Sequence, residues 1–310
     1  MRRFQRLYQY QRERFPLAAT ALLVGALSLA SVTYAQAARL QVDETVAAKG
    51  WLIPVAVAFF CALGFFFQLR VADEFKDYAE DLAYRPYRPV PRGLVTLREL
   101  TGAAATVAAA QALLAWLLAP SLLGPLLLVW GYIELMRVEF FAPAWLKAHP
   151  LVYLLSHMVI LPLIVFFVTA CDWLVAGAAP PAGLGWLLGL SFANGLVFEL
   201  GRKIRAAPDE EPGVQTYSAL WGPQRAVAGW LAALTVAVLV AGFALRQIHI
   251  ADVWNLGLLS LVWCGALVAA WRFGGGQDKA HGNMIERYAA VAILATYVTL
   301  AASALLARQG

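Results

Sequence analysis

Long apolar runs that recur along the whole chain constrain this sequence more than any other feature. A helix needs about 20 apolar residues to cross a bilayer. Runs close to that length fall near residues 17–36, 50–69, 99–118, 121–141, 151–175, 182–200, 224–245, 252–271 and 286–307. Hydrophobic residues make up 61% of the chain and charged residues only 14%, which excludes an ordinary soluble domain. We therefore predict an all-α integral membrane protein, with nine transmembrane helices forming a single domain over residues 1–310.

The basic residues between these runs predict how the chain is oriented. If the N-terminus is cytoplasmic, only Arg39, Lys49, Arg246 and Arg308 of the 24 lysines and arginines fall on the opposite side. Basic residues concentrate in the cytoplasmic loops of membrane proteins. We therefore expect an N-in, C-out topology. As a separate expectation, we place the protein in a bacterial cytoplasmic (inner) membrane. The net charge of +5 then reflects loops beside anionic lipid head groups, and no nucleic acid is needed to explain it.

Three aspartates at the end of the second run, Asp73, Asp77 and Asp81, follow one another in steps of four residues. On a helix, such steps place side chains on one face, each about 6 Å further along the axis. Neighbouring carboxylates repel by roughly 3 kcal/mol at an effective dielectric constant of 20, and solvent, a cation or proton uptake must offset this. Of these, a cation would tell most about function, and magnesium is the candidate because it binds oxygen ligands. The alternative is a solvated helix end, with the aspartates paired to nearby lysines and arginines.

A stiff basic connector follows the aspartates. The sequence RPYRPVPRG ends any helix at its prolines and allows a sharp turn at Gly93. Arg85, Arg88 and Arg92 lie close behind the carboxylates, so guanidinium groups could grip a polyanion that a metal holds on its other side. Diphosphate fits this combination. The two loops richest in charge, residues 70–98 and 201–225, leave the membrane on the same side and could face each other.

The segment from Asp73 to Gly93 resembles the first signature of the UbiA superfamily of intramembrane prenyltransferases. That signature has Asn or Asp, then Asp, then Asp at four-residue steps, followed by RPxPxG. Asp77 and Asp81 match it, Asp73 stands where most members have Asn, and the residues from Arg88 to Gly93 read RPVPRG. The predicted nine spans and the N-in orientation also agree with this family. The predicted arrangement of spans resembles the family over essentially the whole chain. The motif residues, however, lie in only two loops.

The second signature agrees less well. Family members usually carry Asp-x-x-x-Asp after the sixth span, followed by a glycine, a threonine and a closing glycine. Gly213, Thr216 and Gly222 fit the closing part, and Asp209 takes the place of the second acid. Arg205 stands where the first acid belongs. This half of the site therefore either recruits another carboxylate or uses fewer metal ions and more direct contact between basic side chains and phosphate.

Three glutamates are candidates for the missing carboxylate: Glu199, Glu210 and Glu211. Glu199 falls in or at the edge of an apolar run, where an acidic side chain usually faces a cavity or a partner. The alternative is an ion pair with Arg202 or Lys203, which follow it at i+3 and i+4.

The resemblance implies an enzyme that uses Mg²⁺ to transfer the prenyl group of a prenyl diphosphate to a hydrophobic aromatic or quinone-precursor acceptor, with its active site facing the cytoplasm. Asp73, Asp77, Asp81 and Asp209 would be the catalytic, metal-binding carboxylates. The diphosphate would be bound by a set of basic residues, namely Arg88, Arg137, Lys147, Arg202 and Lys203. For those that flank a span, the alternative is the ordinary enrichment of basic residues at cytoplasmic span ends.

Two other functions remain open from the sequence. A terpene cyclase of the same fold would ionise a prenyl diphosphate without an acceptor. A membrane carrier or lipid-binding protein would use the charged loops without chemistry. The sequence places no continuous chain of ionisable groups across the spans, which argues against an ion pathway and makes the carrier the weakest hypothesis.

Overall fold

The computed structural model describes residues 3–41, 50–211, 213–249, 252–275 and 279–307, so Lys49 and Arg308 of the orientation argument lie outside the described residues. Within these ranges the regular structure is helical, without strands. The α-helices are α1 (Arg3–Arg14), α2 (Leu17–Leu40), α3 (Leu52–Lys76), α4 (Tyr78–Tyr84), α5 (Leu97–Leu118), α6 (Leu123–Arg137), α7 (Pro143–Ala148), α8 (Pro150–Met158), α9 (Ile160–Trp173), α10 (Leu184–Arg202), α11 (Tyr217–Trp221), α12 (Pro223–Gln247), α13 (Val253–Gly275) and α14 (Lys279–Ala307).

The apolar runs of the sequence form these helices, with two differences from the prediction. Over the described residues, eight helical segments are long and apolar enough to cross a membrane. The fourth predicted run forms the shorter α6 of 15 residues, after a 3₁₀ turn that begins at Pro120. The fifth run forms α8 and α9, which meet at Val159. Pro162 explains this break, because it has no N–H to donate to the carbonyl of Met158. The prediction of an all-α integral membrane protein is confirmed.

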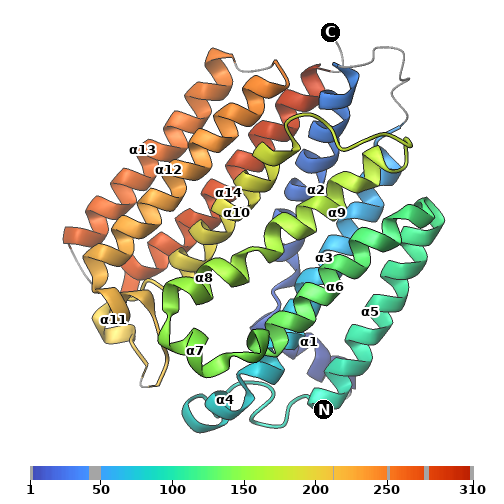
Figure 1. Cartoon of the computed structure of the whole chain (residues 1–310). Coiled ribbons are helices and arrows are strands. Elements are labelled where there is room, and N and C mark those ends of the chain that lie inside the picture. Colours follow the sequence, from blue (N-terminus) through green and yellow to red (C-terminus); the bar gives the residue numbers. More distant parts are fainter. Residues whose placement is uncertain (1–2, 42–49, 212, 250–251, 276–278, 308–310) are drawn as a thin grey trace.

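The helices form a bundle in which α2 and α9 lie centrally, between α3, α5 and α6 on one side and α10, α12, α13 and α14 on the other (Figure 1). Small residues line the buried face of α12, namely Ala226, Ala233, Ala237, Ala241 and Ala244. Small side chains let neighbouring helices approach closely, which is how membrane helices gain packing energy. The extensive contact between α10 and α12 follows from this pattern.

A buried ion pair joins the two central helices near the end of the bundle away from α1. The guanidinium of Arg39 donates to both carboxylate oxygens of Asp172, over 2.8 and 3.0 Å. The two side chains are only 10% and 4% exposed. Because burying an unpaired charge is expensive, this bidentate contact fixes α2 against α9.

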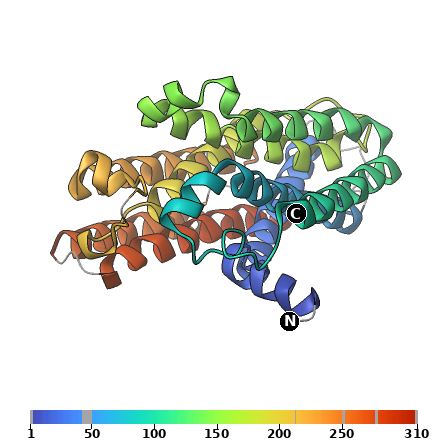
Figure 2. The same cartoon turned by 90° about the horizontal axis from the view of Figure 1, so that it is seen from below.

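The short helices gather at the other end of the bundle. There α1, α4, α7 and α11 lie around the ends of the long helices (Figure 1). Seen from this end, α4 and the connector after it lie between α1 and α7 (Figure 2). Both charged loops of the sequence belong to this end, which is therefore where a site can form.

Candidate functional site

The three aspartates keep the helical spacing that the sequence predicts. Asp77 separates α3 from α4. The backbone hydrogen bonds nevertheless continue through it, from Asp77 N to the carbonyl of Asp73 over 2.9 Å and from Asp81 N to the carbonyl of Asp77 over 2.8 Å. The carboxylates therefore follow one another on successive turns, as steps of four residues require.

Their surroundings, however, differ. Asp73 pairs with Arg70 over 3.6 Å and with Lys76 over 3.3 Å. Among the described residues, no basic side chain forms an ion pair with Asp77. Burial raises the pKa of Asp77 above its usual value, and this outweighs the lowering by the nearby charge of Lys76; the negative charges of Asp73 and Asp81 raise the pKa further. Asp77 is therefore the carboxylate of the three that gains most from a cation.

Asp81 is buried among arginines. Its carboxylate lies 2.7 Å from Arg85, 2.8 Å from Arg88 and 3.9 Å from Arg14, with only 2% of the side chain exposed. Arg14 also pairs with the buried Glu74 over 2.6 Å. The contribution of α1 to this cluster was not predicted, because Arg14 is about 60 residues distant in sequence. The only signal was the basic end of the first helix.

The second loop begins with another buried acid. Glu199, near the end of α10, accepts from Arg202 over 2.6 Å and pairs with Lys203 over 2.8 Å. Its side chain is 8% exposed. This is the i+3 and i+4 pairing that the sequence offered as the alternative to a metal role.

Glu210 has a role within the loop itself. It accepts hydrogen bonds from the hydroxyl groups of Thr216, over 2.7 Å, and Ser218, over 2.8 Å. Thr216 in turn caps α11, because its hydroxyl accepts from the N–H of Ala219 over 3.1 Å. Glu210 thus holds the closing segment of the loop in place.

The two loops meet directly. The hydroxyl of Tyr87 donates to the carboxylate of Glu211 over 3.1 Å. Gly213, with φ +78°, packs its backbone against the ring of Tyr84, so closely that an added Cβ would lie 2.6 Å from ring carbons. These contacts join segments that are more than 120 residues apart in sequence.

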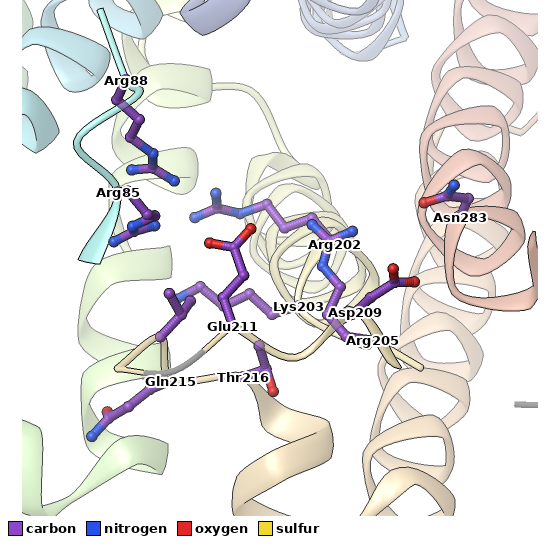
Figure 3. A pocket seen from close by; sticks show the side chains of 11 residues that line it. Arg85, Arg88, Arg202, Lys203, Arg205, Asp209, Glu211, Gln215, Thr216 and Asn283 are labelled. Atoms are coloured by element: carbon purple, nitrogen blue, oxygen red, sulfur yellow. The ribbon is translucent and has the colours of Figure 1, made fainter. Parts of the chain in front are cut away.

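A basic pocket of about 300 Å³ lies between the loops (Figure 3). It is lined by Arg85, Arg88, Arg202, Lys203, Arg205, Asp209, Glu211, Val214, Gln215, Thr216 and Asn283. Arg85 and Arg88 reach toward the pocket from the first loop, and Arg202 extends toward them from the end of α10 (Figure 3). Four residues predicted from the sequence, namely Arg88, Arg202, Lys203 and Asp209, are brought together here. Arg85, which the sequence predicted to help grip a polyanion, also lines the pocket, and Arg205 adds a fifth cation, at the position where the sequence expected an acid.

Arg137 and Lys147, also predicted to contact diphosphate, lie outside this lining. Arg137 pairs with Glu134 over 2.6 Å. It also borders a small cleft beside Asp73 and Lys76, on the α3 side of the site. Lys147 pairs with Glu80 over 2.5 Å and is 60% exposed, so it joins α7 to α4 at the surface. Their role in substrate binding stays a prediction.

Tyr153 connects the aspartate side of the site to the basic pocket. The Lys76 ammonium donates to its hydroxyl over 2.8 Å, and the Lys203 ammonium lies 6.0 Å from the centre of its ring. His157, one turn further along α8, stacks on the same ring with the ring centres 3.9 Å apart. Tyr153 could not be picked out from the sequence, because a tyrosine near the end of an apolar run is common in membrane proteins.

The donor chemistry near Asp77 fits magnesium that is shared with a phosphate. Within the described residues, no group of three or more acidic, histidine or cysteine side chains is arranged to hold a metal ion. Magnesium usually binds one or two carboxylates and completes its shell with water and substrate phosphates. Asp77 and Asp73, on adjacent turns, can supply such a pair. The carboxylate of Asp81 is already engaged by arginines.

Gly213→Ala tests the contact between the loops. We expect it to lower the free energy of unfolding by more than the roughly 1–2 kcal/mol that left-handed backbone costs an L-residue, because its Cβ also meets Tyr84. Gly93→Ala is the matched control, since Gly93 also has a positive φ but has open space around its Cβ position. Thermal unfolding in detergent measures both variants. Equal losses in the two would contradict a role for the Tyr84 contact.

Comparison with known proteins shows the fold of the chain. No family model matches the sequence, and no curated protein does. Among solved structures, a UbiA homologue from Aeropyrum pernix K1 superposes with a TM-score of 0.66 at 17% identity, covering 92% of this chain and 97% of that one. A digeranylgeranylglyceryl phosphate synthase superposes with a TM-score of 0.61 at 14% identity, covering 97% and 99%.

A third solved structure, a UbiA homologue from Archaeoglobus fulgidus bound to GPP and Mg²⁺, superposes with a TM-score of 0.54 at 12% identity, covering 94% of this chain and 99% of that one. Near-complete coverage of both chains confirms that this chain has the fold of the UbiA homologues. The resemblance predicted from the motifs is thus confirmed at the level of the fold.

Proposed function

We propose that this chain is a member of the UbiA superfamily and a magnesium-dependent prenyltransferase. It would transfer the prenyl group of a prenyl diphosphate to an acceptor within the membrane. The fold shared with the UbiA homologues supports this proposal, and one of those homologues has been solved with GPP and Mg²⁺. The aromatic or quinone-precursor nature of the acceptor, suggested by the motif resemblance, is part of the proposal.

The observation that carries the proposal is the meeting of the two loops at one end of the bundle. There the carboxylate of Asp77, which forms no ion pair with a basic residue of the described chain, and a pocket with five basic side chains lie beside the ends of membrane-spanning helices. A prenyl diphosphate has a long apolar chain and a compact, highly charged head. A site of this kind suits both parts, because the chain can lie among the helices while the head meets the charged loops.

In the proposed reaction, the bond between the prenyl carbon and the diphosphate oxygen breaks, and its electron pair leaves with the diphosphate. The acceptor then forms a new bond to the prenyl carbon and loses a proton. Asp73 and Asp77 would hold magnesium, which when bound neutralises charge on the diphosphate. Arg88, Arg202 and Lys203 would donate hydrogen bonds to the oxygens of the leaving diphosphate.

Residues around the charged site would protect the reacting carbon from water. Tyr153 is placed to help, since its ring lies near the ammonium groups of both Lys76 and Lys203 and is covered on one face by His157. The distribution of basic residues in the sequence supports placing this end of the bundle on the cytoplasmic side.

The test is an assay with purified protein, magnesium and prenyl diphosphates of increasing chain length, with and without aromatic acceptors. We expect pyrophosphate release together with an acceptor-dependent product whose mass equals acceptor plus prenyl group minus one hydrogen. Release with a hydrocarbon or alcohol as the product, independent of acceptor, would instead support cyclisation. No release with any chain length would contradict both enzyme hypotheses.

A further inference from the structure

The five basic residues of the pocket share a feature that the proposed mechanism does not use. Each is already paired with a carboxylate. Asp81 holds Arg85 and Arg88, and Glu199 holds Arg202 and Lys203, at distances between 2.6 and 2.8 Å. The fifth, Arg205, reaches Glu286 over 3.4 Å.

The two acids that hold four of these cations lie behind the pocket. Neither Asp81 nor Glu199 belongs to its lining, and their side chains are only 2% and 8% exposed. Glu286 is different, because 43% of its side chain is exposed. Each side of the pocket therefore has one buried carboxylate that holds two basic side chains, and these four basic side chains line the pocket together with Arg205, Asp209 and Glu211 (Figure 3).

The paired cations keep hydrogen-bonding capacity for a second anion. A guanidinium carries five N–H donors, and one carboxylate engages at most a few of them. The Nε of Arg85 is buried and has no hydrogen-bond partner among the described residues. The lining also offers the amides of Gln215 and Asn283. A phosphate group entering the pocket would therefore meet side chains that keep N–H donors, beside the carboxylates of Asp209 and Glu211.

We propose that Asp81 and Glu199 are internal counter-anions of a pocket that binds a phosphate or diphosphate group without a metal ion. They balance the charge of the cations while the pocket is empty, and they compete with the ligand for the same side chains when it enters. Asp81 then acts through Arg85 and Arg88 and is not a magnesium ligand. The identity of the ligand as the diphosphate of a prenyl donor rests on the proposed function.

This role predicts an unusual sign for the effect of neutralising the acids. Removing a metal ligand weakens binding of a metal-bound anion. Removing a counter-anion instead takes away a repelling charge and frees the donors that it engaged. The negative charges of a bound pyrophosphate would lie a few ångströms from the carboxylate of Asp81 or Glu199. They would be repelled strongly, because the effective dielectric constant of a protein is well below that of water. We therefore expect Glu199→Gln and Asp81→Asn to bind inorganic pyrophosphate about tenfold more tightly than the parent protein.

The experiment measures binding of inorganic pyrophosphate to the full-length protein in detergent, with EDTA present, by isothermal titration calorimetry. The parent protein should bind without metal, Arg88→Gln should bind more weakly, and the two neutralised variants more tightly. Glu99→Gln is the control for removing a negative charge at the same end of the bundle, because Glu99 pairs with Arg6 and neither residue lines the pocket. We expect its affinity to equal that of the parent.

Several outcomes would overturn the inference. One is no binding by the parent protein unless magnesium is added. Another is weaker metal-free binding by both neutralised variants, which would mean that the two carboxylates only hold the basic side chains in position. A third is a loss in Asp81→Asn that is confined to magnesium-dependent binding, which would make Asp81 a metal ligand. If Asp81→Asn does not fold, Glu199→Gln decides the sign.

The assay contains no prenyl donor and requires no turnover, so it separates this inference from the proposed function. Tighter metal-free binding in the neutralised variants, combined with no prenyl transfer, would keep the anion pocket and reject the prenyltransferase. Prenyl transfer without metal-free binding of pyrophosphate would keep the prenyltransferase and reject the metal-free anion pocket.

Discussion

Asp77→Asn is expected to lower the rate of magnesium-dependent pyrophosphate release by at least about a hundredfold, the scale on which removing one charge-stabilising group slows catalysis. Asp77 forms no ion pair with a basic residue of the described chain, whereas Asp73 and Asp81 do. It is thus the carboxylate with the least internal compensation. Asparagine keeps the size of the side chain but removes the charge that would hold magnesium.

The measurement is pyrophosphate release across a range of magnesium concentrations. Higher magnesium should restore part of the lost rate if the remaining Asp73 still binds the ion weakly. Glu13→Gln is a suitable control, because Glu13 is an acid at the same end of the bundle that pairs with Arg92, away from the pocket lining. Equal rates for Asp77→Asn and the parent protein would remove Asp77 from the site.

The second large effect concerns stability. Arg39→Ala should lower the free energy of unfolding by about 3–5 kcal/mol, because it leaves the buried carboxylate of Asp172 without its partner. The double variant Arg39→Leu/Asp172→Leu should recover most of this loss, since it removes both charges and fills the space with apolar groups. The comparison separates the cost of an orphaned charge from the net contribution of the pair.

The buried cysteines provide the readout. Cys61 and Cys171 are buried in the folded protein, while Cys264 is exposed. A thiol-reactive fluorophore added in detergent therefore labels Cys61 and Cys171 only as the bundle opens on heating, and Cys264→Ser removes the exposed thiol from the signal. If Arg39→Ala and the double variant open at the same temperature, the ion pair does not contribute in the way proposed.

Much of the fold could be predicted because the length and the apolar composition of membrane-spanning helices are visible in the sequence. The break at Val159 could not be predicted from hydropathy, because the residues on both sides of it are apolar. Similarly, α6 is shorter than its apolar run, because the residues Pro120–Leu122 form a 3₁₀ turn before it and the residues Glu139–Phe141 form another after it. Proline accounts for the break at Val159 and for the turn before α6. Its local effect was visible in the sequence, but the outcome depended on packing.

The candidate site was predictable where its contacts are local in sequence. The pairing of Glu199 with Arg202 and Lys203 follows from helical spacing alone and was weighed as an alternative. The partners of Asp81 were harder, since one of them, Arg14, comes from the first helix. Spacing could place carboxylates on one face of a helix, but it could not tell which of them meets a distant arginine.

The position of Arg14 has a practical consequence for handling the protein. Helix α1 sends this arginine into the charged cluster, where it lies against Glu74 and Asp81. A shortened chain that lacks α1 would leave Glu74 buried without its cation, even though all the long helices remained. Affinity tags and fluorescent fusions are therefore better attached after α14, which ends on the opposite side of the bundle (Figure 1).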